Sequence, residues 1–181
     1  FQKRKDYIKY IYSITRENSA KIQFVGETAL AVVNSKTNSV EFINSTDNAL
    51  ISRLGGAGKT DGQFDELSYV LPDRRGGLFC TDAGLAKISV FDRNLKFVGR
   101  FLSKGSKPGY IKRPISITRN SRAEFAIADG GKDSIEIFNK DWIYLTSISG
   151  KFNNDSLKPA VALFDSADNL FVLDADNGRI L

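Results

Sequence analysis

Residues Glu124–Asp129 read EFAIAD, and three other stretches of the chain share this design: Ala29–Asn34 (ALAVVN), Gly77–Asp82 (GLFCTD) and Asn169–Asp174 (NLFVLD). Each stretch is a short apolar run closed by Asn or Asp. The closing residues fall at positions 34, 82, 129 and 174, so the copies are 48, 47 and 45 residues apart. A short apolar run bounded by turn residues is typical of a β-strand that is buried on both faces.

A second series of strand-like segments keeps the same step: Val40–Asn44 (VEFIN), Ile88–Asp92 (ISVFD) and Ile135–Asn139 (IEIFN). Repeats of about 45 residues that each contain several short strands are typical of β-propeller blades. We therefore predict an all-β fold, namely a β-propeller of four-stranded antiparallel blades, with about four blades in this chain.

The third repeat shows the expected blade most clearly. Pro114 opens a first strand, the apolar strand 125–128 is the second, and strands at 135–138 and 143–148 follow after short turns. Four strands joined by short turns form an up-and-down blade, and such blades pack face to face around an axis.

The other repeats are assigned by comparison with this one. Residues 10–14 resemble the fourth strand at 144–148, so an outer strand is expected at 8–14. The predicted blades are 19–54, 67–102, 114–148 and 159–181, of which the last is incomplete, and the whole propeller is 8–181 after a basic tail at 1–7.

Two arrangements of these blades remain open. In one, the outer strand at 8–14 closes onto the partial blade at 159–181 and completes a four-bladed ring. In the other, the chain is part of a six-bladed ring whose remaining blades are missing. The last blade stops within its third strand, which favours the six-bladed ring.

Charge and composition are those of an ordinary globular domain. Of the 181 residues, 41% are apolar and 26% are charged, and the net charge is +5. The first 17 residues supply a surplus of three positive charges, so the rest of the chain is nearly neutral and its basicity is a weak argument for nucleic-acid binding.

No apolar run reaches the ~18–20 residues that span a bilayer, so we expect no transmembrane segment. The location stays undecided, with a lean towards an extracytoplasmic or membrane-associated site.

The residue inventory argues against an enzyme. The chain contains no histidine, which excludes Ser-His-Asp and Cys-His catalysis and histidine-bound zinc within this chain. The single cysteine, Cys80, lies in an apolar strand and is interpreted as a small buried hydrophobic residue. The aspartates Asp82, Asp129 and Asp174 are interpreted as residues that cap turns through backbone N–H groups, not as metal ligands. We therefore assign no catalytic, cofactor-binding or metal-binding residues and expect no cofactor.

The repeat resembles the NHL-repeat β-propellers over residues 8–181. In that family a glycine, an aromatic residue and a proline precede the first strand, an Asp follows the second strand, and an Asn and an Arg lie in the next turn. The matching residues are Gly62 with Phe64, Gly109 with Tyr110 and Pro114, Pro159, the aspartates Asp82, Asp129 and Asp174, and Asn177 with Arg179. The chain departs from the pattern at Leu67, which replaces the proline, and at Asn34, which replaces the Asp. The Asn and Arg pair is kept only in the last copy.

This resemblance implies a binding module. Proteins with similar repeats are most often RNA-binding or protein-binding parts of larger regulators, or extracytoplasmic ligand-sensing and scaffold domains. A minority are lyases whose metal sites contain histidine.

Partners of propellers usually dock on the face that gathers the inter-blade loops. The loop 103–113 carries four cations, no anion and one aromatic residue, and the next loop adds further cations. The candidate partner-binding residues are Lys104, Lys107, Tyr110, Lys112, Arg113, Lys151, Phe152 and Lys158. Cations interleaved with aromatic residues also suit phosphate contacts and base stacking.

Three functions follow from these observations. We expect a non-catalytic propeller that binds protein partners or serves as a scaffold within a larger protein or assembly. The alternative is an RNA-binding propeller that uses the loop 103–113. A second alternative is a metal-dependent lyase whose catalytic residues lie outside this chain.

Overall fold

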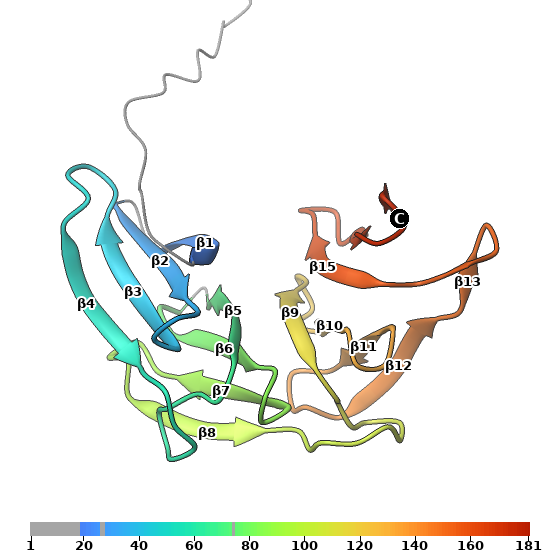
Figure 1. Ribbon diagram of the computed structural model, residues 1–181, viewed down its shortest axis with the longest axis horizontal. Coiled ribbons are helices and arrows are strands. Elements are labelled where there is room, and N and C mark those ends of the chain that lie inside the picture. The colour runs from blue at the N-terminus through green and yellow to red at the C-terminus, as the bar shows by residue number, and fades with distance from the viewer. Residues whose placement is uncertain (1–18, 26–27, 74) are drawn as a thin grey trace, which may run out of the picture.

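The computed structural model describes residues 19–25, 28–73 and 75–181, and in these residues the chain forms only strands, turns and loops. Three four-stranded antiparallel sheets and one three-stranded sheet follow one another along an arc (Figure 1). This confirms the predicted all-β propeller fold. The predicted tail at 1–7 and the predicted outer strand at 8–14 lie outside the described residues.

Each sheet is one repeat, and we name the sheets blades 1 to 4 in chain order. Blade 1 contains β1 (Ser19–Val25), β2 (Ala29–Asn34), β3 (Ser39–Asn44) and β4 (Leu50–Gly55). Blade 2 contains β5 (Leu67–Pro72), β6 (Leu78–Asp82), β7 (Lys87–Phe91) and β8 (Phe97–Phe101). Blade 3 contains β9 (Pro114–Arg119), β10 (Phe125–Asp129), β11 (Ser134–Phe138) and β12 (Tyr144–Ser149). Blade 4 contains β15 (Pro159–Phe164), β16 (Leu170–Asp174) and β17 (Arg179–Ile180), and a small hairpin of β13 (Lys151–Phe152) and β14 (Asp155–Ser156) precedes it.

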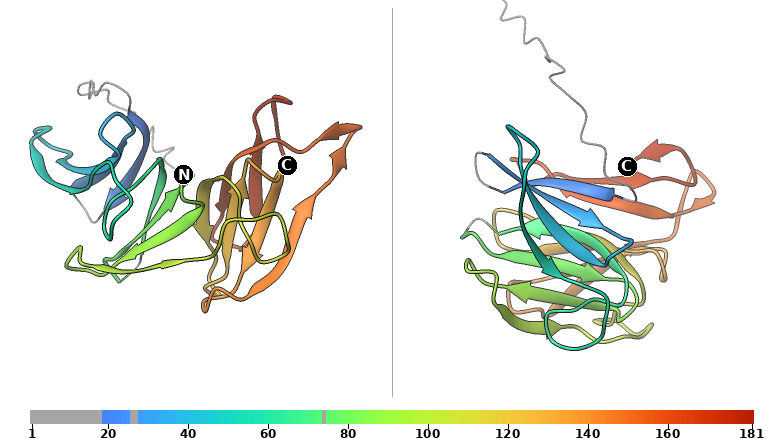
Figure 2. Two further views of the ribbon diagram at one scale, coloured as in Figure 1. Left: turned by 60° about the horizontal axis from the view of Figure 1, so that its bottom comes forward. Right: turned by 60° about the vertical axis from the view of Figure 1, so that its left-hand side comes forward.

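The strands of every blade follow one another from the inside of the arc to the outside. Within each sheet the strands are paired in chain order, so the first strand is always at one edge. The first strands β1, β5, β9 and β15 lie along the concave side of the arc, and β4, β8 and β12 lie along its convex side (Figures 1 and 2). Neighbouring blades touch through these inner strands, since β1 contacts β5, β5 contacts β9 and β9 contacts β15.

The same backbone irregularities recur from blade to blade. A β-bulge interrupts the pairing of the first and second strands in all four blades, always near the start of the first strand. A left-handed backbone recurs in equivalent turns at Asn48, Leu95 and Trp142, with φ values of 61°, 58° and 62°. Left-handed φ is unfavourable for residues other than glycine, so its repetition shows that the fold imposes it at this point of each blade.

The core lies between the blades. Because successive side chains of a strand point to opposite faces, the second strand of a blade contacts both neighbouring blades. In β10, Phe125 and Ile127 pack against blade 2, whereas Ala126 and Ala128 pack against blade 4. The two-sided contact explains why the second strands of blades 2 and 3 contain so few polar residues.

Candidate functional site

The inter-blade loops are anchored by one buried side chain each. Phe64, Ile111 and Leu157 are almost fully buried, and each has a backbone bond that closes its loop. Ile111 N–H, for example, donates to the carbonyl of Ser103 at 3.0 Å. Phe64 and Ile111 also form matching parallel bridges, to Ala57 and to Lys104. The sequence comparison had set Tyr110 beside Phe64, but Ile111 fills the place of Phe64 and leaves Tyr110 exposed.

The repeated aspartates hold these loops to the blades. Asp129 accepts hydrogen bonds from the backbone N–H groups of Lys112 at 2.6 Å and Arg113 at 2.9 Å, and also from Gly131 in the turn that follows its strand. Asp82 binds the N–H groups of Asp65, Glu66 and Leu85 in the same way. The predicted cap of the following turn is therefore present in both blades, and the preceding loop is held as well.

Asp174 carries the same role in blade 4 with different partners. It accepts from the N–H of Lys158 at 2.8 Å and from the side chains of Asn177 and Arg179. Burial by itself would raise the pKa of Asp174, but hydrogen bonds from Asn177, Lys158 and Arg179 outweigh it, so the pKa is lowered. The carboxylate of Asp174 thus remains charged at neutral pH and holds the backbone of the loop that contains Lys158.

Four of the predicted binding residues lie together on the loop 103–113. Lys104, Lys107, Tyr110 and Lys112 are all exposed. The Nζ of Lys104 donates to the carbonyl of Gly84 at 3.3 Å. In the part of the chain that the structure describes, the ammonium groups of Lys107 and Lys112 have no acceptor within hydrogen-bonding distance. Two free cations and one exposed ring therefore project from an ordered loop.

The remaining candidates lie towards blade 4 and are more strongly paired. Arg113 forms an ion pair with Glu66 at 2.5 Å, and Lys158 forms one with Asp133 at 2.5 Å. The hydrogen bond to Asp133 raises the pKa of Lys158. Arg113, Lys158 and Asp133 also line a shallow cavity of about 240 Å³ between blades 3 and 4.

Lys151 and Phe152 form the strand β13, where the sequence analysis had expected loop. Lys151 is exposed, whereas Phe152 is half-buried and packs against the core between blades 3 and 4. Phe152 therefore supports the hairpin, and Lys151 is the side chain of this pair that a partner can reach.

These residues make up a face of mixed charge. We use the name loop face for Lys104, Lys107, Tyr110, Lys112, Arg113 and Lys158 together with their acidic neighbours Glu66 and Asp133. Lys132 contacts this loop from the neighbouring turn of blade 3. Its Nζ donates to the carbonyl of Tyr110 at 3.0 Å and forms an ion pair with the buried Glu136 at 2.9 Å. The loop is thus fixed in place by a charge pair beneath it.

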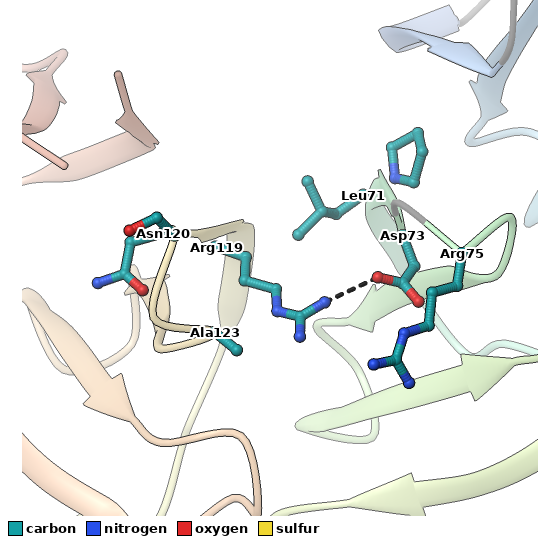
Figure 3. Close-up of a pocket in the computed structure, with 8 residues that line it drawn as sticks. Leu71, Asp73, Arg75, Arg119, Asn120 and Ala123 are labelled. Atoms are coloured by element: carbon teal, nitrogen blue, oxygen red, sulfur yellow. Dashed lines mark hydrogen bonds and ion pairs between the residues drawn. The ribbon is translucent and has the colours of Figure 1, made fainter. Parts of the chain in front are cut away.

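A second hollow, of about 330 Å³, lies on the opposite side of the blades, between the turns that follow β5 and β9 (Figure 3). Arg119 and Asp73 face each other across it and form an ion pair at 2.7 Å. The guanidinium of Arg119 lies over the rings of Phe79 and Phe125, at 6.0 and 5.4 Å from their centres. The pair therefore joins blade 2 to blade 3.

Sequence reasoning missed the residues of this hollow, although the signal was present. Arg119 and Asp73 are 46 residues apart, which is one repeat step. Opposite charges one repeat apart predict a contact between neighbouring blades at equivalent turns. A hydrogen bond between Ser121 and Asp168, which are 47 residues apart, joins the same turns of blades 3 and 4.

The chemistry of the described residues is limited. Across 19–25, 28–73 and 75–181, no cluster of three or more Cys, Asp or Glu side chains is arranged to hold a metal ion. Cys80 is fully buried, and burial raises the pKa of its thiol, so it stays protonated and unreactive at neutral pH.

Known proteins resemble this chain in structure but not in sequence. No protein-family model matches the sequence, and no curated protein matches it. The fold is similar to a streptogramin B lyase, with a TM-score of 0.67, 15% identity, and coverage of 93% of this chain and 52% of that one. It is also similar to a catalytically inactive virginiamycin B lyase from Staphylococcus aureus with quinupristin, with a TM-score of 0.63, 13% identity, and coverage of 94% and 57%. The WD40 domain of Pan2 from Neurospora crassa follows with a TM-score of 0.59, 10% identity, and coverage of 85% and 43%.

These comparisons establish a β-propeller and nothing finer, because identities of 10–15% show the fold alone. The chain spans about half the length of the two lyases. In the described residues there is no helix that could cross a bilayer.

Proposed function

We propose that this chain is a protein-binding propeller that uses the loop face as its docking platform within a larger assembly. The proposal rests on the loop 103–113, where Lys107, Lys112 and Tyr110 are exposed. Within the described residues, the side chains of these three form no hydrogen bond.

The fixed loop favours binding because little conformational freedom is lost when a partner docks. Ile111 anchors it, Asp129 holds two of its N–H groups, and Lys132 holds the carbonyl of Tyr110. An exposed aromatic side chain on a rigid support is a common anchor of protein interfaces.

The charge pattern favours a protein over RNA. Glu66 and Asp133 lie beside Arg113 and Lys158, and their carboxylates would repel a phosphate backbone. A protein partner with acidic and hydroxyl side chains can match a face of both signs, because opposite charges across an interface steer docking and select the partner.

We further propose that the repeats are of the NHL type. The contact of Asp174 with both Asn177 and Arg179 supports this, since these three residues, together with Pro159, are the ones by which the last repeat resembles that family. The predicted extracytoplasmic or membrane-associated location remains a prediction.

The test compares two triple variants with equal changes in charge. The first replaces Lys104, Lys107 and Lys112 with Glu, and the matched control replaces Arg93, Lys96 and Lys140 with Glu in the turns after the third strands. Proteins retained from an extract of the native source by the immobilised chain are quantified for each. We expect at least one protein to be lost about tenfold or more from the first variant and kept by the control. Equal retention by both variants contradicts the proposal.

The same variants examine the RNA alternative. Binding of a labelled single-stranded RNA is followed by fluorescence anisotropy as the salt concentration rises. If RNA binds and the loop variant abolishes it with a reduced salt dependence, the loop face is an RNA site and the protein-binding proposal is wrong. The lyase alternative has only the fold of its neighbours in its favour, and no described residue supplies the chemistry.

A further inference from the structure

A small polar cavity of about 160 Å³ lies between the loop 103–113 and the outer strands of blade 3. Ser106 and Pro108 line it from the loop, and Glu136, Tyr144 and Ser147 line it from β11 and β12. We call it the Glu136 cavity.

The carboxylate of Glu136 is paired through one oxygen only. The side chain is 1% exposed, and its Oε1 accepts from the Nζ of Lys132 at 2.9 Å and from the hydroxyl of Ser134 at 2.6 Å. In the part of the chain that the structure describes, Oε2 is buried and has no hydrogen-bond partner. A buried carboxylate oxygen without a donor is unfavourable, so we expect a donor here that the described chain does not supply.

In blade 1 the equivalent carboxylate is paired with an arginine. The strand register sets Glu41 opposite Arg53 across β3 and β4, just as it sets Glu136 opposite Ser147 across β11 and β12. The guanidinium of Arg53 donates to the buried carboxylate of Glu41 at 3.0 Å. Blade 3 therefore keeps the carboxylate of this cross-strand pair and has a serine in place of the arginine.

Blade 2 also has an arginine at this position of the fourth strand. Arg53, Arg100 and Ser147 follow one another at steps of 47 residues. The guanidinium of Arg100 donates to the carbonyl of Lys59, in the loop before blade 2, at 2.9 Å. It also lies 5.7 Å from the centre of the Phe97 ring. In both earlier blades, then, a guanidinium group lies where blade 3 has only a hydroxyl.

The groups that contact Arg100 have counterparts around the Glu136 cavity. The same step of 47 residues relates Lys59 to Ser106 and Phe97 to Tyr144. Ser106 and Tyr144 both line the cavity. It thus combines a carboxylate, a loop backbone and an aromatic ring, which are the groups that bind and stack on arginine in blades 1 and 2.

We propose that the Glu136 cavity binds a guanidinium group that the described chain does not supply, carried by an arginine side chain of a protein partner. The guanidinium donates to Oε2 of Glu136 and lies against the ring of Tyr144, in the way that Arg53 and Arg100 are held. Its planar set of five N–H donors suits a site with several acceptors.

The neighbouring Lys132 sets the strength of this site. Its ammonium group already pairs with Oε1 of Glu136, so the cavity is neutral overall and attracts a second cation only weakly. A free guanidinium ion therefore binds with low affinity, and the arginine of a partner is held also by the contacts around it. The cavity adjoins Lys107 of the loop face, so the assignment to a protein partner rests on the proposed function, whereas the guanidinium site itself does not.

The experiment is a titration of the chain with ethylguanidinium chloride, followed through the backbone amide signals of Glu136 and Ser147 in NMR spectra. Ethylammonium chloride at equal ionic strength is the control for charge. We expect the signals to shift and saturate with ethylguanidinium, at a concentration at least about tenfold lower than with ethylammonium, because only the guanidinium has the planar fork of donors.

Two variants with equal changes in charge locate the binding. Glu136→Gln removes the carboxylate and should weaken the binding of ethylguanidinium at least about tenfold, since hydrogen bonds to charged acceptors are the stronger ones. Asp141→Asn removes one charge from an exposed turn and should bind as the natural chain does.

Ser147→Arg restores in blade 3 the arginine of blades 1 and 2. Because its guanidinium would fill the cavity, we expect it to abolish the binding of ethylguanidinium and to raise the midpoint of thermal unfolding by about 2–4 °C. Ser147→Gln, which is uncharged, should not raise the midpoint. Ser147 is exposed, so these variants test the site even if Glu136→Gln does not fold.

Three outcomes contradict the proposal. If neither cation gives a saturating shift, or if both give the same one, the cavity holds solvent only. If Ser147→Arg binds ethylguanidinium as well as the natural chain, the ion is bound elsewhere. If Ser147→Arg retains every protein that the natural chain retains from an extract, the partner does not place an arginine in the cavity.

Failure of this inference is distinguishable from failure of the proposed function. The titration needs no partner, and charge reversal at Lys104, Lys107 and Lys112 leaves Glu136 and Ser147 in place. A chain that binds ethylguanidinium while its loop variant retains all proteins would keep the guanidinium site and lose the docking platform. The opposite pair of results would keep the platform and lose the site.

Discussion

Stacked aromatic rings lie at the junction of blades 2 and 3, whereas at the junction of blades 3 and 4 the second strand of blade 3 presents alanines. At the first junction the rings of Phe125 and Trp142 stack with centres 4.4 Å apart and planes 8° apart. Phe101 stacks on Trp142 as well, at 5.3 Å, and Phe79 meets Phe125 edge to face at 4.9 Å. Large aromatic side chains therefore fill this junction.

At the second junction the second strand of blade 3 contributes only small side chains, and hydroxyl groups bind the neighbouring backbone. Ala126 and Ala128 face blade 4, and the hydroxyl of Ser116 accepts a hydrogen bond from the N–H of Ala162 at 3.0 Å. The hydroxyl of Thr118 accepts one from the N–H of Phe164 at 3.2 Å. Hydrogen bonds between neighbouring first strands occur at both junctions, since the hydroxyl of Ser68 in β5 donates to the carbonyl of Pro114 in β9 at 2.7 Å. The comparison teaches that the same backbone repeat accommodates either large aromatic or small side chains between its blades.

The largest expected effect is at the aromatic junction. Phe125→Ala removes a buried ring that contacts Phe79 and Trp142, so we expect a loss of about 3–5 kcal/mol in the free energy of unfolding. Urea unfolding followed by the fluorescence of Trp142, the only tryptophan, measures it. Val98→Ala, at an exposed position, should change stability by less than about 0.5 kcal/mol. A loss below about 1 kcal/mol at Phe125 would show that the rings do not close this junction.

Overfilling the second junction should cost less. Ala126→Leu forces a larger side chain against the tightly packed blade 4, and the expected loss is about 1–3 kcal/mol. Thermal unfolding by circular dichroism measures it, with Ala167→Leu as the control in a surface turn. A stabilised Ala126→Leu would mean that this junction holds unfilled space.

Removing a hydrogen bond from the same junction comes next. Ser116→Ala leaves the N–H of Ala162 without its acceptor, so we expect a loss of about 1–2 kcal/mol. Ser166→Ala, which changes an exposed hydroxyl, should have no measurable effect. If the two variants have equal unfolding midpoints in urea, the hydroxyl of Ser116 does not stabilise the junction.

The smallest effect is a pH dependence at the turns that follow β9 and β15 in this junction. The hydroxyl and backbone N–H of Ser121 bind Asp168 and lower its pKa below the ordinary 3.8. Because the folded pKa is the lower one, the stability that Asp168 contributes is complete above the unfolded pKa and is lost as the pH falls through the folded pKa. Asp168→Asn should therefore be less stable than the natural chain at about pH 6, and the gap should narrow from about pH 4 downward. A gap that stays constant between about pH 6 and about pH 2 contradicts this assignment.

Much of the fold was predictable because its signal is local. The runs before Asn34, Asp82, Asp129 and Asp174 mark the second strands, and their spacing predicts the blades. The absence of histidine restricted the chemistry in the same direct way. The loop 103–113 was selected as the candidate binding site because of its four cations, its lack of an anion and its one aromatic residue, and this assignment stays a prediction.

Other features could not be derived from the pattern. The glycine-and-aromatic comparison placed Tyr110 beside Phe64, but the bulk of Ile111 fills the loop anchor. No local signal distinguishes which of two neighbouring apolar residues turns inward when a loop has no regular period. The strand β13 was missed for the same reason, because two residues are too short for a periodic signal.

The sequence by itself determined where most strands lie and that the chain has no histidine, because these depend on composition and on periods along the chain. Only the tertiary structure decided which side chains fill each junction. It also decided that, among the described residues, the ammonium groups of Lys107 and Lys112 have no hydrogen-bond partner while Arg113 and Lys158 form ion pairs. The physical reason is that these contacts join side chains far apart in the sequence, many of them one repeat apart. Their distances are set by the packing of whole blades and not by any neighbour in the sequence.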